Sequence, residues 1–160
     1  MKLNMQKKII LCLLLALSQA SFVLAQKSPN RYESEWLTNP NAGKKDTRQV
    51  NAVIVFEQNS IKIFSRRKSE IFKEFQYKNI RSVEHSYSKN LLISNRTRAT
   101  ILMILTGLPA WNTGKERHWL TIVSEDDFVV LKIENDNYRL IKNEFAIRKL
   151  EIENINEDRQ

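Results

Sequence analysis

The chain has 160 residues, which is room for one domain of ordinary size. Hydrophobic residues make up 42% and charged residues 28%, a composition that excludes a disordered chain. The formal net charge is +8, and three glycines are too few for a glycine-rich phosphate-binding loop.

The first 25 residues have the three-part layout of a secretory signal peptide. Three lysines without an acidic residue make the basic start, and an apolar run over 9–17 follows. The run is too short to span a bilayer, which needs about 20 apolar residues. We predict cleavage after Ala25 and export to the periplasm or the outside. Cleavage after Ala20 and an uncleaved N-terminal anchor are the alternatives.

The only cysteine, Cys12, lies inside this apolar run and would leave with the peptide. A mature chain without cysteine forms no disulfide, thiol nucleophile or thiolate metal site. Its formal charge would be +5. Its stability must then come from the burial of apolar side chains.

Residues 26–49 are predicted to be a polar, irregular leader without a core of its own. Pro29, Pro40 and Gly43 interrupt it, as is typical of loops. Trp36 is the exception, and we expect it to dock onto the following domain.

From residue 50 the pattern changes to β-branched and apolar residues that alternate with polar ones. Turn residues separate these runs, which is typical of antiparallel strands. In the fourth run His85 and Tyr87 share one face, and Glu84 lies on the other. The predicted strands are 50–56, 61–65, 70–75, 80–88, 118–123 and 128–133.

One helix is predicted near the C-terminus, at about 137–148, with Asn135 or Asp136 as its N-cap. Three of its apolar residues have the spacing of a single helix face, which should be buried against the sheet. They are Tyr138, Ile141 and Phe145.

This order of elements predicts a mainly β protein with one C-terminal α-helix. We expect a bent antiparallel sheet, or partly open barrel, that the helix caps. The domain would span 50–152. Residues 153–160 would form an acidic tail that frays.

Five segments resemble proteins of the pleckstrin-homology (PH) superfold, namely 61–67, 77–83, 114–122, 128–131 and 137–139. Over about 50–152 the chain is similar to bacterial PH-like or GRAM-like proteins of unassigned role. The resemblance implies a bent barrel closed by a C-terminal helix. It implies no ligand, because one fold serves many functions.

An irregular, apolar insertion is predicted over 88–117. Thirteen uncharged residues follow Arg98, too few to cross a bilayer. One hypothesis is a peripheral contact with an anionic membrane. The other, which we favour because an exposed apolar loop would aggregate, is a strand or helix packed in the core over 101–105. The membrane hypothesis would use Arg96, Arg98, Ile101, Leu105 and Trp111.

Charge is unevenly spread, at +9 over 26–117 and −4 over 118–160. The basic residues of 26–117 are densest in a predicted turn between strands, at Arg66, Arg67 and Lys68. They could contact an anionic surface or partner, or simply remain hydrated. Export and the lack of a base-reading motif argue against nucleic acid as a partner.

No catalytic, metal or cofactor constellation is predicted. His85 and His118 are the only histidines, and neither has a second ligand at a metal spacing. No G-x-S-x-G motif occurs. We therefore expect an exported, non-enzymatic PH-like module without a cofactor, which binds a protein, a peptide or an envelope surface. The alternative is a peripheral membrane protein that uses the segment from Arg96 to Trp111.

Overall fold

The computed structural model describes residues 30–38, 48–68, 70–104 and 112–156. Within these ranges eight strands form one sheet, accompanied by one short 3-10 helix and two α-helices. The strands are β1 (Asn30–Thr38), β2 (Arg48–Phe56), β3 (Ser60–Ser65), β4 (Ile71–Gln76), β5 (Ile80–Asn90), β6 (Asn112–Ser124), β7 (Phe128–Ile133) and β8 (Glu153–Asn154). The helices are η1 (Tyr77–Asn79), α2 (Asn95–Ile104) and α3 (Asn135–Ile147).

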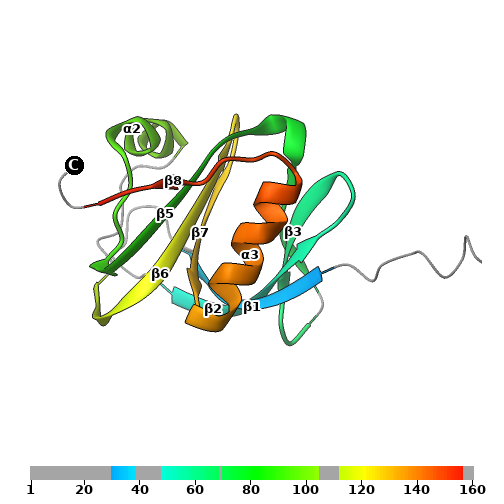
Figure 1. Ribbon diagram of the computed structural model, residues 1–160, viewed down its shortest axis with the longest axis horizontal. Helices are drawn as coiled ribbons and strands as arrows, with labels where there is room; N and C mark the ends of the chain where they lie inside the picture. Colours follow the sequence, from blue (N-terminus) through cyan, green and yellow to red (C-terminus); the bar gives the residue numbers. More distant parts are fainter. Residues whose placement is uncertain (1–29, 39–47, 69, 105–111, 157–160) are drawn as a thin grey trace, which may run out of the picture.

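The sheet is mixed and open, with the strand order β4-β3-β2-β1-β7-β6-β5-β8. All neighbours are antiparallel except β5 and β8. The sheet is strongly bent. The bend brings Lys73 of β4 to Asp127 of the β6–β7 turn, several strands away in the sheet, where the two form a 2.6 Å ion pair. The helix α3 lies across the concave face (Figure 1). The predicted fold class, a bent and mainly β sheet capped by one C-terminal helix, is confirmed.

The prediction of an irregular leader over 26–49 is wrong for residues 30–38, which form β1 between β2 and β7. Charged residues at every second position of β1 made this segment resemble a polar loop in the sequence. In the fold, Glu33 forms an ion pair with Arg66 at 2.8 Å, and Glu35 forms one with Lys132 at 2.6 Å. The expected docking of Trp36 is confirmed, because its ring lies 4.7 Å from that of Phe72.

The helix α3 covers the main core with the face that its spacing predicts. Ile141 and Phe145 are fully buried, and Tyr138 is partly buried. The N-cap prediction is wrong. Glu134 occupies that position without a side-chain hydrogen bond, and Asn135 and Asp136 belong to the helix itself.

A left-handed residue ends α3 and turns the chain towards β8. Lys149 has a φ of 59°, and its N–H donates to the Ala146 carbonyl. The Leu150 N–H donates to the Phe145 carbonyl, which completes a Schellman motif. The chain therefore leaves the helix in a defined direction.

The described parts of the segment 88–117, residues 88–104 and 112–117, are largely regular, contrary to the prediction of an irregular insertion. The strand β5 continues to Asn90, α2 spans Asn95–Ile104, and β6 begins at Asn112. Ile101 is fully buried, which confirms the packed-helix hypothesis for this residue. Leu105 and Trp111 lie outside the described residues.

The expected fraying of the C-terminal segment is wrong for residues 153–155. The strand β8 pairs in parallel with β5, and the N–H of buried Ile155 donates to the His85 carbonyl at 2.8 Å. The predicted signal peptide, residues 1–25, lies outside the described part of the chain. Among the helices that the structure describes, none has the length and hydropathy to cross a membrane.

Candidate functional site

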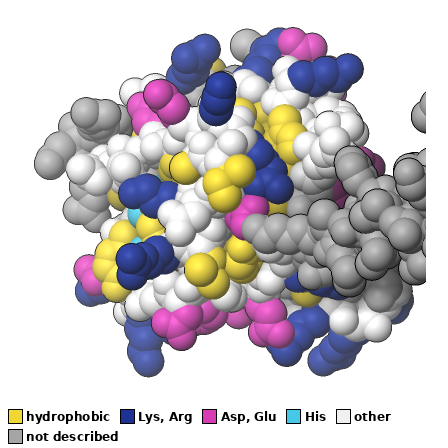
Figure 2. Space-filling view, turned by 45° about the vertical axis from the view of Figure 1, so that its right-hand side comes forward, with side chains coloured by type: hydrophobic (Ala, Val, Ile, Leu, Met, Phe, Trp, Pro, Cys, Tyr) yellow, Lys and Arg dark blue, Asp and Glu magenta, His cyan; other side chains and the backbone are white. Residues whose placement is uncertain are grey.

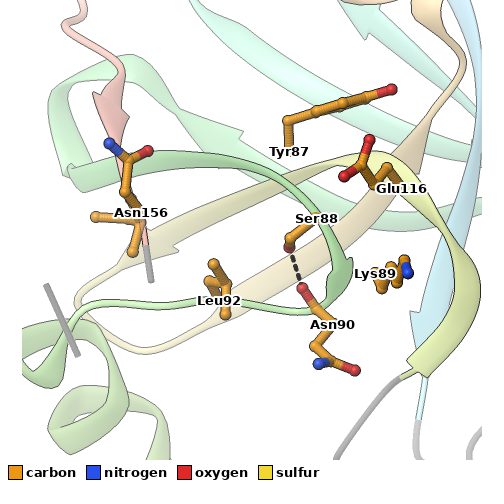
Figure 3. Close-up of a pocket in the computed structure, with 8 residues that line it drawn as sticks. Tyr87, Ser88, Lys89, Asn90, Leu92, Glu116 and Asn156 are labelled. Atoms are coloured by element: carbon orange, nitrogen blue, oxygen red, sulfur yellow. Dashed lines mark hydrogen bonds between the residues drawn. The ribbon is translucent and has the colours of Figure 1, made fainter. Parts of the chain in front are cut away.

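A pocket of about 500 Å³ opens beside β5, where β8 has ended. The strand β8 pairs only with Glu84 and His85, whereas β5 continues to Asn90. Figure 3 shows the pocket between the end of β5, the following loop, β6 and the C-terminal segment. Its lining residues are Tyr87, Ser88, Lys89, Asn90, Leu92, Glu116, Ile155 and Asn156.

The main chain of β5 faces this pocket. The N–H and C=O of one strand residue point to the same side, and every second residue repeats the direction. The His85 carbonyl points to β8, because it accepts the Ile155 N–H. Tyr87, two residues later, therefore directs its N–H and C=O to the same side, and no described residue of β8 pairs with it. Within the described residues, the pocket thus borders a strand edge without a partner strand.

The surface of the pocket is mostly polar, with two buried aliphatic side chains among its lining residues. Leu92 and Ile155 are buried, whereas Tyr87 is half-exposed and Lys89 and Glu116 are exposed. Glu116 lies on the same side of the pocket as Tyr87 in Figure 3. A ligand here would meet aliphatic, aromatic and charged groups within a short distance of the strand edge.

Four aromatic side chains form a stack next to the pocket. The Tyr138 ring of α3 lies nearly parallel to both imidazoles, 4.0 Å from His85 and 4.3 Å from His118. The Tyr87 ring, which lines the pocket, is 4.7 Å from His118. In Figure 2 histidine shows only as small areas between hydrophobic and basic side chains. The stack therefore joins α3, β5 and β6 behind the pocket.

The two histidines are joined in a chain of hydrogen bonds. His85 Nδ1 is 2.9 Å from the Asn154 Oδ1 of β8, and His85 Nε2 is 2.8 Å from His118 Nδ1. An amide oxygen only accepts, so His85 carries its proton on Nδ1. In the neutral pair His85 Nε2 must then accept the proton of His118 Nδ1. The outer nitrogen of His118, Nε2, is left as the proton acceptor.

Burial lowers the pKa of both imidazoles. For His85 the hydrogen bond with Asn154 raises the pKa, while the charges of His118 and Lys142 lower it further. For His118 burial alone lowers the pKa. Both rings are therefore predominantly neutral at pH 7. Both ring nitrogens of His85 form hydrogen bonds within the fold.

On the opposite face of β5, Glu84 fixes the start of α2. Its buried carboxylate accepts hydrogen bonds from the Ser94 N–H, at 3.0 Å, and from the Ser94 and Thr97 hydroxyls. Ser94 Oγ in turn accepts the Thr97 N–H at 3.1 Å. A carboxylate at a helix N-terminus is stabilised by the helix dipole. Glu84 is thus a structural residue that holds α2 on the sheet.

The predicted contact residues do not form one site. Arg66, Arg67 and Lys68 are exposed at the β3–β4 turn, where Arg66 is paired with Glu33. Arg96 is exposed and Arg98 partly buried on α2, beside the opposite end of the sheet order. Ile101 is a core residue and is wrong as a surface contact. Within the described residues, no group of three metal-ligating side chains occurs.

The sequence reasoning missed the pocket, because residues far apart in the chain build it. It did place His85 and Tyr87 on one face of a strand. Nothing local in the sequence places His118 beside them, since the register of β5 and β6 pairs it with Tyr87. Nor does the sequence predict that a two-residue strand, β8, brings Asn154 to His85.

Comparison with known proteins gives similarity to solved structures alone. No protein-family model matches the sequence, and no curated protein matches it. Among solved structures the chain is similar to the hSac2 domain from the human phosphoinositide phosphatase Sac2. The sequence identity is 13%, the TM-score is 0.46, and the match covers 97% of this chain and 92% of that one.

This likeness corrects one expectation. Because the matched domain comes from a phosphatase, the prediction that the chain is not an enzyme is withdrawn. An identity of 13% assigns no reaction to this chain, and none is derived from it.

Proposed function

We propose that the protein is an exported PH-like module that binds an extended segment of a partner protein along β5. The observation that carries the proposal is the open edge of β5, which continues past the end of β8 and borders a pocket. The signal-peptide layout of residues 1–25 supports export. The bent sheet with a C-terminal helix across it supports the PH-like assignment.

An extended peptide fits this edge because its main chain supplies one donor and one acceptor per residue. Strand addition of this kind gives affinity through the main chain and specificity through alternate side chains. The mostly polar lining of the pocket would receive a polar side chain of the peptide. Lys89 and Glu116 at the rim would select charged residues beside it. An unpaired strand edge can pair with other chains and cause aggregation, so we expect a binding partner to cover it.

The test is to pan a random dodecapeptide library against residues 26–160 and to measure the binding of a selected synthetic peptide by calorimetry. The Tyr87→Pro variant removes the N–H at the open edge, and a proline is tolerated at an edge strand. Its matched control, Tyr87→Ala, removes the same ring but keeps the N–H. We expect Tyr87→Pro to bind about 10-fold more weakly than Tyr87→Ala, the effect of one main-chain hydrogen bond.

NMR chemical shifts locate the peptide on the protein. Shift changes along 86–90 and at Ile155 would support the proposal. Failure to select any peptide, equal affinities of the two variants, or shift changes confined to another face would contradict it.

A further inference from the structure

We propose that His85 and His118 form a proton-operated latch for β8: the pair accepts one proton with its hydrogen bonds intact, and a second proton separates the rings and releases β8. The latch follows from the hydrogen-bond chain that runs from Asn154 through His85 to His118. Its effect on ligand binding rests on the proposed function, because Ile155 and Asn156 line the pocket.

The first proton has one place to go without loss of a hydrogen bond. His85 Nδ1 already donates to Asn154 Oδ1, and His85 Nε2 accepts from His118 Nδ1. His118 Nε2 is the nitrogen outside this chain, so it takes the proton. The resulting imidazolium still donates from Nδ1 to His85. The face of Tyr138, 4.3 Å away, stabilises the charge by a cation–π contact.

The second proton can only reach His85 Nε2, and there it breaks the chain. Two N–H donors would then face each other across 2.8 Å. Two positive rings would lie 5.1 Å apart. Lys142 of α3 adds a further positive charge on His85, whereas Asn154 of β8 faces it with a neutral amide. The Tyr138 ring, 4.0 Å from His85, is already shared with the charged His118, and a cation–π contact does not offset two opposed donors and the repulsion of the charges. The rings therefore have to separate.

The strand β8 depends on the position of His85. Three contacts hold it there: the parallel pairing at Glu84 and His85, the Asn154 side chain on the imidazole, and the Ile155 N–H on the His85 carbonyl. A strand of two residues has little stability of its own. All three contacts involve His85, the residue that moves. Displacement of His85 removes the side-chain contact and shifts the carbonyl. Release of β8 would open the pocket at the side formed by Ile155.

NMR titration of the chain over 26–160, without ligand, tests the latch. We expect two histidine steps, both below about pH 6.5 and separated by about one pH unit or more. The first step should be at His118 Nε2 and the second at His85. The Ile155 amide should exchange faster with solvent at the second step only. The amide of Leu131 in the main core should stay protected throughout.

The His118→Asn variant is the matched control, because its amide donates from nearly the same position as Nδ1 but accepts no proton. It should show one histidine step, at His85. Titration of both imidazoles in one step would overturn the latch, as would an unchanged Ile155 amide. Simultaneous loss of protection at Leu131 would also overturn it, since β8 would then open only by global unfolding. Peptide affinity measured across the same pH range separately tests the consequence for binding, so the latch and the proposed function fail independently.

Discussion

Phe145 of α3 meets Phe56 of β2 edge to face, with ring centroids 5.2 Å apart and ring planes at 89°. Both rings are buried. One turn further along the helix, the Arg148 guanidinium lies 5.1 Å from the Phe56 ring and pairs with Glu144 at 2.6 Å. An aromatic contact and a partly buried ion pair thus hold the C-terminal end of α3 against the sheet.

Replacement of Phe145 by alanine should therefore destabilise the whole domain. We expect a loss of about 3–5 kcal/mol in the free energy of unfolding, because a fully buried aromatic ring leaves a cavity. Asn143→Ala, at an exposed position of the same helix, is the control and should change stability by less than about 0.5 kcal/mol. Urea denaturation measures both. Equal midpoints for the two variants would show that Phe145 does not anchor α3 on the sheet.

The stability of the protein should decrease between about pH 6.5 and pH 5, because burial lowers the pKa of His85 and His118 in the fold. In the unfolded chain both imidazoles titrate at about pH 6.5. Below that value the unfolded state binds protons that the folded state does not. The contribution is complete above about pH 6.5 and is lost as the pH falls towards the folded pKa values.

Urea denaturation at several pH values measures this slope. The double variant His85→Gln with His118→Asn should be less stable at pH 7 but should show a flatter profile between pH 7 and pH 5. Carboxylates contribute mainly at lower pH. A wild-type profile as flat as that of the double variant would contradict the assigned pKa directions.

The carboxylate of Glu84 should be essential for the docking of α2. In Glu84→Ala the Ser94 and Thr97 donors lose their acceptor, at a cost of about 1–3 kcal/mol for each group left unsatisfied. Glu116→Ala, at an exposed position of β6, is the control and should be nearly neutral. Thermal unfolding gives the stabilities, and amide exchange over 95–104 reports on the helix. Unchanged exchange in Glu84→Ala would mean that apolar packing alone holds α2.

The strongly periodic elements could be predicted from the sequence. The strand β7 was expected at 128–133 and is Phe128–Ile133, and the buried face of α3 follows from its spacing. Both elements rest on one core, so the hydrophobic pattern and the fold agree. The core of the second sheet face, formed by Leu37, Trp119 and Val130, was not predicted.

Three elements escaped prediction for different physical reasons. Two carboxylates of β1 are paired with residues far away in the sequence, Arg66 in the β3–β4 turn and Lys132 on β7, so the sequence of β1 reads as a loop. The helix α2 has a local N-cap, Ser94, but the carboxylate that holds this cap on the sheet, Glu84, comes from β5. The strand β8 has two residues and no pattern. The pocket and the histidine pair depend on these same long-range contacts, so the local sequence does not predict them either.

The final prediction separates the core and membrane hypotheses for α2. Ile101 is fully buried, so Ile101→Ser should cost more than about 2 kcal/mol, through a lost apolar contact and a buried hydroxyl. Ala99→Ser on the exposed side of the same helix introduces the same hydroxyl and should cost less than about 1 kcal/mol. Neither change should alter the fraction that sediments with phosphatidylglycerol vesicles under conditions where the protein is folded. If Ile101→Ser kept its stability but left the vesicles, Ile101 would instead be a residue that enters the membrane surface.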